Sequence, residues 1–249
     1  MAWRLLTLLK NPGDYIRDRQ KKLKEPEMNL KLRNGLTIIL RSGTSDRCVF
    51  NDLWLEQAYA LPGLTYEKYS TIIDVGAHIG LFALFAAKAS PHATIHAFEP
   101  EPENFALLKR NAEVNHLSDR ITMAQEGLSG EKGTIQLHVI PGRGECHSSY
   151  RQAEESYPIT IPVTTLEEVF RRYTIERCDL LKMNCEGEEY NILLSLPNTL
   201  YDRIGAILLN YHLFSPDPKK HPRVLREKLE ERGFVISKHL RNFFVATRP

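Results

Sequence analysis

One short loop of this sequence combines a carboxylate with two glycines. It reads Asp74-Val75-Gly76-Ala77-His78-Ile79-Gly80 and closes the β-branched run at 71–75. Gly76 permits a tight turn in which the backbone comes close to a ligand, and Gly80 permits the next helix to pack tightly on a sheet. Because a strand that leads through such a loop into a helix binds ligands at its carboxyl end, Asp74, Gly76, Ala77 and Gly80 are candidate cofactor-binding residues.

A second carboxylate follows at the distance expected of a ribose ligand. Glu99 stands nineteen residues after Gly80, at the end of the next apolar run and directly before Pro100. An acid at this position accepts hydrogen bonds from the two hydroxyls of a ribose. Glu99 and Pro100 are therefore expected to face the adenosine part of a cofactor.

The glycine spacing distinguishes between two cofactors that contain adenosine. A nicotinamide dinucleotide requires G-x-G-x-x-G, so that its pyrophosphate can lie on helix-terminal amides. Here the spacing is G-x-x-x-G, and His78 stands where the middle glycine would be. The carboxylate of Asp74 suits the cationic end of S-adenosylmethionine better than a diphosphate. The pattern therefore favours S-adenosylmethionine.

Groups that could act on a methyl acceptor follow two later strands. Methyl transfer is an in-line displacement at a carbon that the sulfonium activates, so orienting the acceptor supplies much of the rate, and a base helps to remove a hydroxyl proton. Asn184 and Glu186 follow the run at 179–183, and His212 follows the run at 203–209. A neutral His212 imidazole would take a proton near pH 7. His212, Glu186 and Asn184 are the candidate catalytic residues.

Three other features near these groups have weaker patterns. Lys182 is expected to pair with an acid on a helix. The polar loop from Pro141 to Tyr157 and the basic turn from Pro216 to Pro222 are candidates for the rim of an acceptor pocket.

These residues need a frame of alternating strands and helices. Apolar runs predict strands over residues 71–75, 93–98, 120–124, 133–140, 179–183, 203–209, 234–237 and 243–246. Helical periodicity predicts helices over residues 78–89, 101–115, 166–173, 186–194 and 223–232. Such alternation is typical of a parallel sheet covered on both faces, to which the last two strands add an antiparallel hairpin. The expected fold class is α/β, doubly wound.

Three stretches of the chain differ in composition. Residues 1–27 are polar and basic, and we expect a helix or arm. Residues 28–70 predict a hairpin about Asn34-Gly35 and a helix over 52–59, packed on the core. Residues 71–249 form the expected cofactor-binding domain.

Composition excludes several classes of protein. The chain has 249 residues, with 33 Lys and Arg against 31 Asp and Glu, so its net charge gives no support for bulk nucleic-acid binding. Residues 1–33 are more basic, with a local net charge of +5. We interpret the N-terminus as a solvated helix or frayed arm, with weak contact to an anionic membrane surface as the alternative.

The cysteines point to a reducing compartment. Cys48, Cys146, Cys178 and Cys185 form no C-x-x-C pair and no Cys/His ligand spacing. We therefore expect reduced thiols, no metal site and a cytoplasmic protein, peripheral at the membrane if the N-terminus binds there.

Four motifs together resemble one known family. They are DVGAHIG at 74–80, AFEPEPENFALLKRN at 97–111, TTLEEV at 164–169 and LLKMNCEGEEYNIL at 180–193, and GTSDRCVFNDLWLEQAY at 43–59 is similar to the segment that precedes them. In this order they resemble the FkbM family of S-adenosylmethionine-dependent methyltransferases, over roughly residues 30–249.

The resemblance implies a class I methyltransferase fold with a Rossmann-like, seven-stranded sheet. It also implies O-methylation of a sugar, glycolipid or small natural product. By this resemblance Asp74, Gly76 and Gly80 approach the methionine part of the cofactor, Glu99 holds the ribose and Glu126 lies near the adenine. The chain departs from the family at two positions, because Asn184 and Asn210 stand where members usually carry Asp and Glu.

These departures leave alternatives open. An amide binds a divalent cation poorly and holds no proton, so the chain could be a catalytically weakened, cofactor-binding relative. A nicotinamide-dependent oxidoreductase is disfavoured by the glycine spacing. A nucleic-acid methyltransferase is disfavoured because no N/D-P-P-Y-like clamp follows the strand at 179–183. The expected partner is a small-molecule or glycan acceptor, with no nucleic acid.

Overall fold

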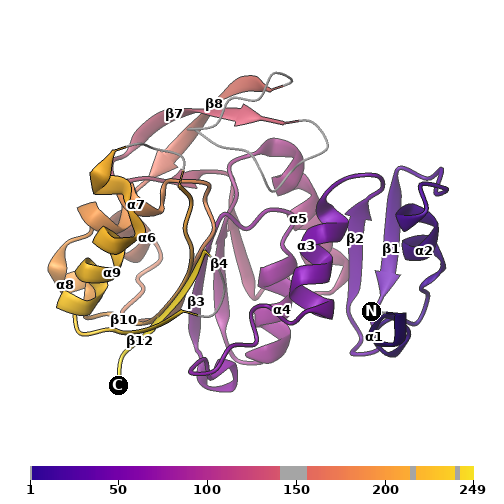
Figure 1. Cartoon of the computed structure of the whole chain (residues 1–249), viewed down its shortest axis with the longest axis horizontal. Helices are drawn as coiled ribbons and strands as arrows, with labels where there is room; N and C mark the ends of the chain where they lie inside the picture. Colours follow the sequence, from indigo (N-terminus) through magenta and orange to yellow (C-terminus); the bar gives the residue numbers. More distant parts are fainter. Residues whose placement is uncertain (1, 141–155, 214–216, 239–241) are drawn as a thin grey trace.

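The computed structural model describes residues 2–140, 156–213, 217–238 and 242–249. Its central sheet consists of β3 (Thr71–Val75), β4 (Thr94–Phe98), β5 (Ile121–Ala124), β9 (Cys178–Met183), β10 (Ile204–Asn210), β11 (Val235–Lys238) and β12 (Phe243–Thr247). Their order across the sheet is β11-β12-β10-β9-β3-β4-β5 (Figure 1). The strands from β10 to β5 are parallel, and β12 is antiparallel to both of its neighbours. The predicted doubly wound, mostly parallel seven-stranded sheet with a C-terminal hairpin is confirmed.

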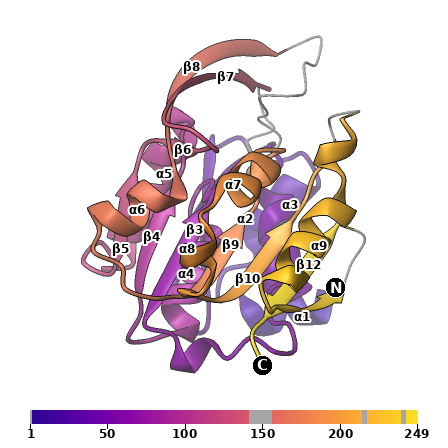
Figure 2. The same ribbon diagram turned by 90° about the vertical axis from the view of Figure 1, so that its left-hand side faces the viewer.

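Helices cover both faces of this sheet (Figures 1 and 2). One face carries α4 (Leu81–Ala89) and α5 (Pro102–Val114), and the other carries α6 (Leu166–Arg172), α7 (Glu189–Ser195), α8 (Asn198–Tyr201) and α9 (Pro222–Glu231). Because successive strand residues point to opposite faces, Leu180 joins the first apolar cluster and Leu181 joins the second. The sheet is therefore buried on both sides, as its apolar sequence requires.

Two helices begin three residues later than predicted, and both delays occur beside the cavity described below. The helix expected from His78 begins at Leu81, because His78 (φ 53°) and Gly80 (φ 86°) adopt left-handed conformations. The helix expected from Glu186 begins at Glu189, because Glu186 (φ 53°) does the same. Left-handed backbone at a residue other than glycine is strained and is found often at functional sites.

An N-terminal unit packs against α4 and α5 (Figure 1). It contains α1 (Ala2–Leu8), α2 (Gly13–Arg19), the hairpin of β1 (Glu27–Lys31) and β2 (Thr37–Arg41), and α3 (Asp46–Phe50), which continues as a π-helix over Asn51–Leu55. The hairpin confirms the prediction. The helix predicted over 52–59 instead spans 46–55, because Arg41 holds the Asp46 carboxylate at its start.

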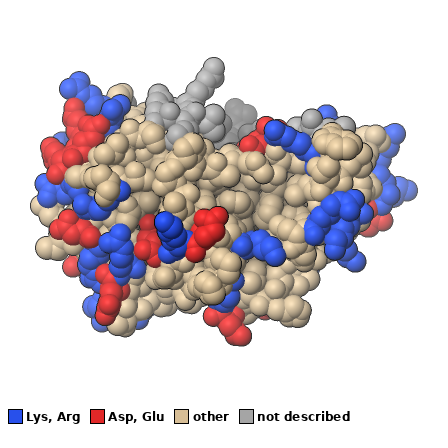
Figure 3. Space-filling model, turned by 90° about the horizontal axis from the view of Figure 1, so that it is seen from below, with Lys and Arg blue, Asp and Glu red and all other residues tan. Residues whose placement is uncertain are grey.

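The N-terminal residues form helices, α1 and α2, but these pack on the rest of the chain and are not a solvated or frayed arm. Leu5, Leu9 and Tyr15 are buried in the main apolar cluster, and Leu9 forms an antiparallel bridge with Leu32 beside the hairpin. Lys and Arg side chains gather on the surface of this unit, on the right of Figure 3, and these basic residues made its buried apolar side chains hard to recognise in the sequence. None of the helices in the described ranges has the length and apolar character needed to cross a membrane.

A small second sheet overhangs the central one (Figure 2). It contains β6 (Gly127–Leu128), β8 (Tyr157–Thr164) and β7 (Gly133–Val139), in the order β6-β8-β7. The strand predicted over 133–140 exists as β7 but lies in this sheet, and β8 was not predicted. Residues 141–155 of the proposed acceptor loop, residue 216 of the basic turn and Cys146 lie outside the described residues.

Candidate active site

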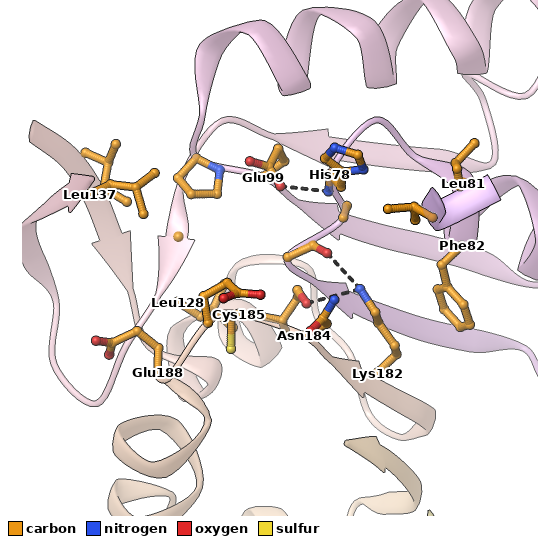
Figure 4. A pocket seen from close by; sticks show the side chains of 18 of the residues that line it. His78, Leu81, Phe82, Glu99, Leu128, Leu137, Lys182, Asn184, Cys185 and Glu188 are labelled. Carbon is orange, nitrogen blue, oxygen red and sulfur yellow. Dashed lines mark hydrogen bonds between the residues drawn. The ribbon is translucent and has the colours of Figure 1, made fainter. Parts of the chain in front are cut away.

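A cavity opens at the carboxyl ends of β3, β4 and β9, below the small sheet (Figure 4). The space between its walls is about 910 Å³, part of it open to solvent. The sequence-predicted residues on its wall are Gly76, Ala77, Glu99, Pro100, Asn184 and Glu186. One cavity therefore combines residues proposed to hold a cofactor with residues proposed to act on an acceptor.

Asp74 lies beneath the wall of the cavity. Its Oδ1 accepts a hydrogen bond of 2.7 Å from Nζ of Lys182, which also donates to the carbonyl oxygen of Gly76 at 2.7 Å. Lys182 therefore pairs with a strand acid and not with the predicted helix acid. Burial raises the pKa of Asp74, and the charge of Lys182 opposes that rise. Oδ2 of Asp74 is buried and has no hydrogen-bond partner among the described residues.

Both predicted glycines have a left-handed backbone, and at Gly76 crowding by the neighbouring backbone excludes a side chain as well. Gly76 has φ 73°, and a Cβ there would lie 2.0 Å from the backbone oxygen of Asn184. Gly80 has φ 86°, and its Cβ would lie 2.5 Å from Cδ1 of Leu108 on α5. Gly80 thus leaves room for α5, whereas the sequence analysis predicted that it would let the helix pack on the sheet. Gly76 lets the loop after β3 lie directly against the loop after β9.

Glu99 is buried at the end of β4 with its carboxylate on the cavity wall (Figure 4). Its Oε2 accepts from the backbone N–H of His78 at 2.7 Å, and its Oε1 accepts from the N–H of Glu101 at 3.0 Å. Burial raises the pKa of Glu99, while His78 and the two amides lower it. The left-handed turn at His78 is what aims that N–H at the carboxylate.

Glu126 does not line the cavity. Its carboxylate forms an ion pair with Arg172 on α6, and the next two residues, Gly127 and Leu128, form the wall on that side. A contact between Glu126 and a bound adenine stays a prediction.

Asn184 and Asn210 bring the ends of β9 and β10 together. Nδ2 of Asn210 donates to Oδ1 of Asn184 at 3.0 Å, and the backbone N–H of Asn184 donates to Val75 at 3.0 Å. A hydrogen bond therefore joins the two amides, whereas two carboxylates at these positions would repel each other. Asn184 lines the cavity (Figure 4).

His212 lies between two carboxylates. Its Nε2 is 3.1 Å from Oε1 of Glu186, and its Nδ1 is 2.9 Å from Oε1 of Glu189. Burial alone would lower the pKa of His212, but the hydrogen bonds and charges of both glutamates outweigh it and raise the pKa to about 10. At neutral pH His212 is therefore an imidazolium. This corrects the prediction of a neutral imidazole base.

Glu189 is a site residue that sequence reasoning missed. It is fully buried, and it accepts the backbone N–H of Cys185 at 2.9 Å and that of Gly187 at 2.8 Å, besides contacting His212. These bonds fix the loop that carries Glu186 into the cavity. In the sequence, Glu189 stands three residues after Glu186 in an acid-rich helix start. The helix dipole favours acids at any such position, so this position did not mark Glu189 as a site residue.

Apolar residues from two other parts of the chain complete the wall. The N-terminal unit and the segment that follows it contribute Val49, Leu53 and Tyr59, and the small sheet contributes Ile135, Leu137 and Ile161. Leu53 lies in the π-helix. Such helices are rare in proteins, and those that occur are often found at functional sites. Within the described residues, no group of three or more His, Cys, Asp or Glu is arranged to hold a metal ion.

Comparison with known proteins identifies relatives of the chain. Residues 74–236 match the family model described as the methyltransferase FkbM domain. The chain is 32% identical over 212 residues to the 31-O-demethyl-FK506 methyltransferase FkbM of Streptomyces tacrolimicus, covering 74% of this chain and 81% of that protein. It is 26% identical over 219 residues to methyltransferase sdnD of Sordaria araneosa, covering 76% and 82%.

A solved structure shares the fold. The methyltransferase FkbM of Methylobacillus flagellatus superposes with a TM-score of 0.50 at 14% identity, covering 82% of this chain and 53% of that chain. At this identity the likeness concerns the fold alone.

Proposed function

Because this chain belongs to the FkbM family of methyltransferases, we propose that it transfers the methyl group of S-adenosylmethionine to a hydroxyl of a sugar, glycolipid or small natural product. One observation carries the proposal. Glu99 and the loop after β3 line the same cavity as Asn184 and Glu186, from adjacent strand ends. The sulfonium cofactor and the acceptor would thus meet in one enclosed space.

The residues present fit S-adenosylmethionine. The buried carboxylate of Glu99 lines the cavity together with Gly76 and Ala77, a set of groups that suits a ribose beside a cationic group. Asp74 lies beneath this wall, so its contact with the methionine part stays a prediction. Glu99 would accept the ribose hydroxyls, and Gly127 and Leu128 would flank the adenine. When bound, the cofactor supplies a methyl group activated by a positive sulfur.

We expect Glu186 to accept the proton that an acceptor hydroxyl loses. It lines the cavity, and its Oε1 is held by the His212 imidazolium. His212 would act as a positioning residue, because its own proton is stabilised by both Glu186 and Glu189. Asn184 would orient the acceptor through its amide. A base placed in this way contributes about 10²–10⁴ to the rate.

The cavity walls and a relative support the proposed acceptor class. The FkbM protein of Streptomyces tacrolimicus is named for methylation at an oxygen. In the present chain, the apolar side chains of Val49, Leu53 and Ile135 border the cavity. We therefore expect an acceptor that presents its hydroxyl beside an apolar surface.

The test is transfer of labelled methyl from S-adenosylmethionine to a panel of sugars, glycolipids and hydroxylated natural products. We expect label on oxygen in at least one acceptor, with Glu186→Gln reducing kcat. The weakened-relative alternative predicts cofactor binding without turnover, and activity that returns when Asn184→Asp and Asn210→Glu are combined.

We also propose a cytoplasmic location with contact between α1 and anionic membrane surfaces. Trp3 is 78% exposed and Leu6 is 51% exposed, and residues three apart lie on one helix face. Nε of Arg33 donates to the carbonyl of Leu6, which places a cation beside this apolar pair. Vesicle sedimentation tests the contact. Binding to anionic but not zwitterionic vesicles, lost in Trp3→Ser/Leu6→Ser, is expected, and equal recovery of both proteins from anionic vesicles would contradict it.

A further inference from the structure

Arg41, at the end of β2, connects the N-terminal unit to the cofactor side of the cavity. Its Nε donates to Oδ2 of Asp46 at 2.9 Å, and its Nη2 donates to Oδ1 of Asp46 at 2.8 Å and to Oδ1 of Asn104 at 2.7 Å. Such a bidentate, charge-assisted pair fixes orientation as well as position. Arg41 therefore holds one residue of α3 and one residue of α5 at the same time.

Asp46 extends this connection to the loop after β3. Its side chain is fully buried, and its Oδ1 lies 3.4 Å from Nε2 of His78. Burial would raise the pKa of Asp46, but His78 and Arg41 outweigh it and hold the pKa well below its usual range. The buried carboxylate is thus charged and is partnered from both sides, which keeps the His78 ring against the N-terminal unit.

Both branches end on Glu99. His78 donates its backbone N–H to Oε2 of Glu99 at 2.7 Å, and Nδ2 of Asn104 lies 3.5 Å from Oε1. The left-handed backbone of His78 is strained, so it needs an external hold to persist. Asp46 contacts the ring of His78 and Arg41 fixes Asp46, so both contribute to that hold.

We infer that Arg41 and Asp46 are positioning residues for the cofactor site, acting through His78 and Asn104 to orient the Glu99 carboxylate. Both lie before the residues that match the family model, which begins at residue 74. The inference rests on the proposed role of Glu99 toward the ribose. It assigns to the N-terminal unit a part in recognising the cofactor, beyond covering the core.

The same two parts of the chain also touch at places that do not lead to Glu99. Arg110 on α5 forms a bidentate ion pair with Glu27 on β1 at 2.6 and 2.7 Å. Asn115, at the end of α5, donates to the carbonyl of Thr37 and accepts its N–H. These contacts dock the N-terminal unit without reaching the cavity, so Arg110→Ala is a matched control.

The experiment compares two ligands by calorimetry, S-adenosylhomocysteine and its analogue without the ribose 2′-hydroxyl. If Glu99 binds the ribose, the full-length protein should prefer the hydroxylated ligand by about tenfold or more, since a charged hydrogen bond is lost with the hydroxyl. We expect this preference to fall toward one in Asp46→Asn and to persist in Arg110→Ala. If Asp46 had only a structural role, Asp46→Asn would weaken the binding of both ligands equally and leave the ratio of their affinities unchanged.

Asn104→Ala removes the second branch without altering the hairpin, so it serves if Asp46→Asn does not fold. A folded Asp46→Asn or Asn104→Ala with the wild-type ratio would overturn the inference. A wild-type protein that does not bind S-adenosylhomocysteine would instead overturn the proposed function, so the two failures are distinguishable.

Discussion

Nζ of Lys182 and Oδ1 of Asp74 lie 2.7 Å apart, and neither side chain is more than 4% exposed. The pair joins β9 to β3 directly beneath the cavity. An ion pair this deep is costly to break on one side, because the remaining charge stays buried. Its removal is therefore a test of how the loop after β3 is held.

Lys182→Met keeps most of the apolar stem and removes the charge that faces Asp74. We expect the free energy of unfolding to fall by about 3–5 kcal/mol, measured by urea denaturation. The control is Arg171→Met, which breaks the exposed pair with Glu168 and should leave the free energy of unfolding nearly unchanged. Equal, small effects in both variants would show that the buried pair does not fix the loop.

Gly76→Ala tests the contact between the loops after β3 and β9. The new methyl would meet the Asn184 oxygen at 2.0 Å in a left-handed backbone, so we expect a loss of at least about 3 kcal/mol together with loss of cofactor binding. Gly133→Ala is the matched control, because its Cβ meets nothing within 4 Å. A stable Gly76→Ala protein would mean that the two loops are not pressed together.

The protonation of His212 should make the free energy of unfolding depend on pH. Its pKa is raised from 6.5 to about 10, so the folded protein binds this proton more tightly than the unfolded chain does. The stabilisation is fully present below pH 6.5 and is lost as the pH rises toward 10. We expect the difference in unfolding free energy between wild type and His212→Gln to shrink over this window.

The control for that measurement is His92→Gln, at an exposed turn residue. This variant gives the effect of removing an exposed histidine. If the His212→Gln difference stayed constant over this window, the imidazolium between Glu186 and Glu189 would not exist in solution.

Substitutions at Asn184 and Asn210 should have non-additive effects on the free energy of unfolding. Asp at position 184 can still accept from Nδ2 of Asn210, and Glu at position 210 can accept from Nδ2 of Asn184 once that amide turns over. Asn184→Asp and Asn210→Glu should therefore each cost about 1 kcal/mol or less. Together they place two carboxylates side by side, and we expect the double variant to lose more than the sum above neutral pH. The excess should diminish as the pH falls and one acid becomes protonated. Additive losses at every pH would contradict this.

The predictable part of the site lies within one strand–helix–strand unit. Asp74, Gly76 and Glu99 are close in sequence, and the local geometry of that unit places them at neighbouring strand ends. The roles of Glu189 and Asp46 could not be predicted in the same way. Each depends on a partner from a distant segment, His212 for one and His78 for the other, and a single sequence does not reveal such pairs.

The small sheet escaped prediction for a local reason. β8 contains Pro158 and Pro162, and proline inside an apolar run argues against a strand because it cannot donate to the ladder. Here β8 pairs with β6 through two residues only, Val163 and Thr164, so the ladder tolerates both prolines. The protonation of His212 escaped prediction because the sequence shows the imidazole but not the two carboxylates that flank it.

Calorimetric titration with S-adenosylhomocysteine tests the central claim most directly, with NAD as the competing ligand and Glu99→Gln and Arg171→Met as variants. We expect wild type and Arg171→Met to bind S-adenosylhomocysteine with a Kd of about micromolar, Glu99→Gln to bind at least about tenfold more weakly, and none of them to bind NAD. A folded wild-type protein that does not bind S-adenosylhomocysteine, or a Glu99→Gln variant with unchanged affinity, would contradict the proposed cofactor site.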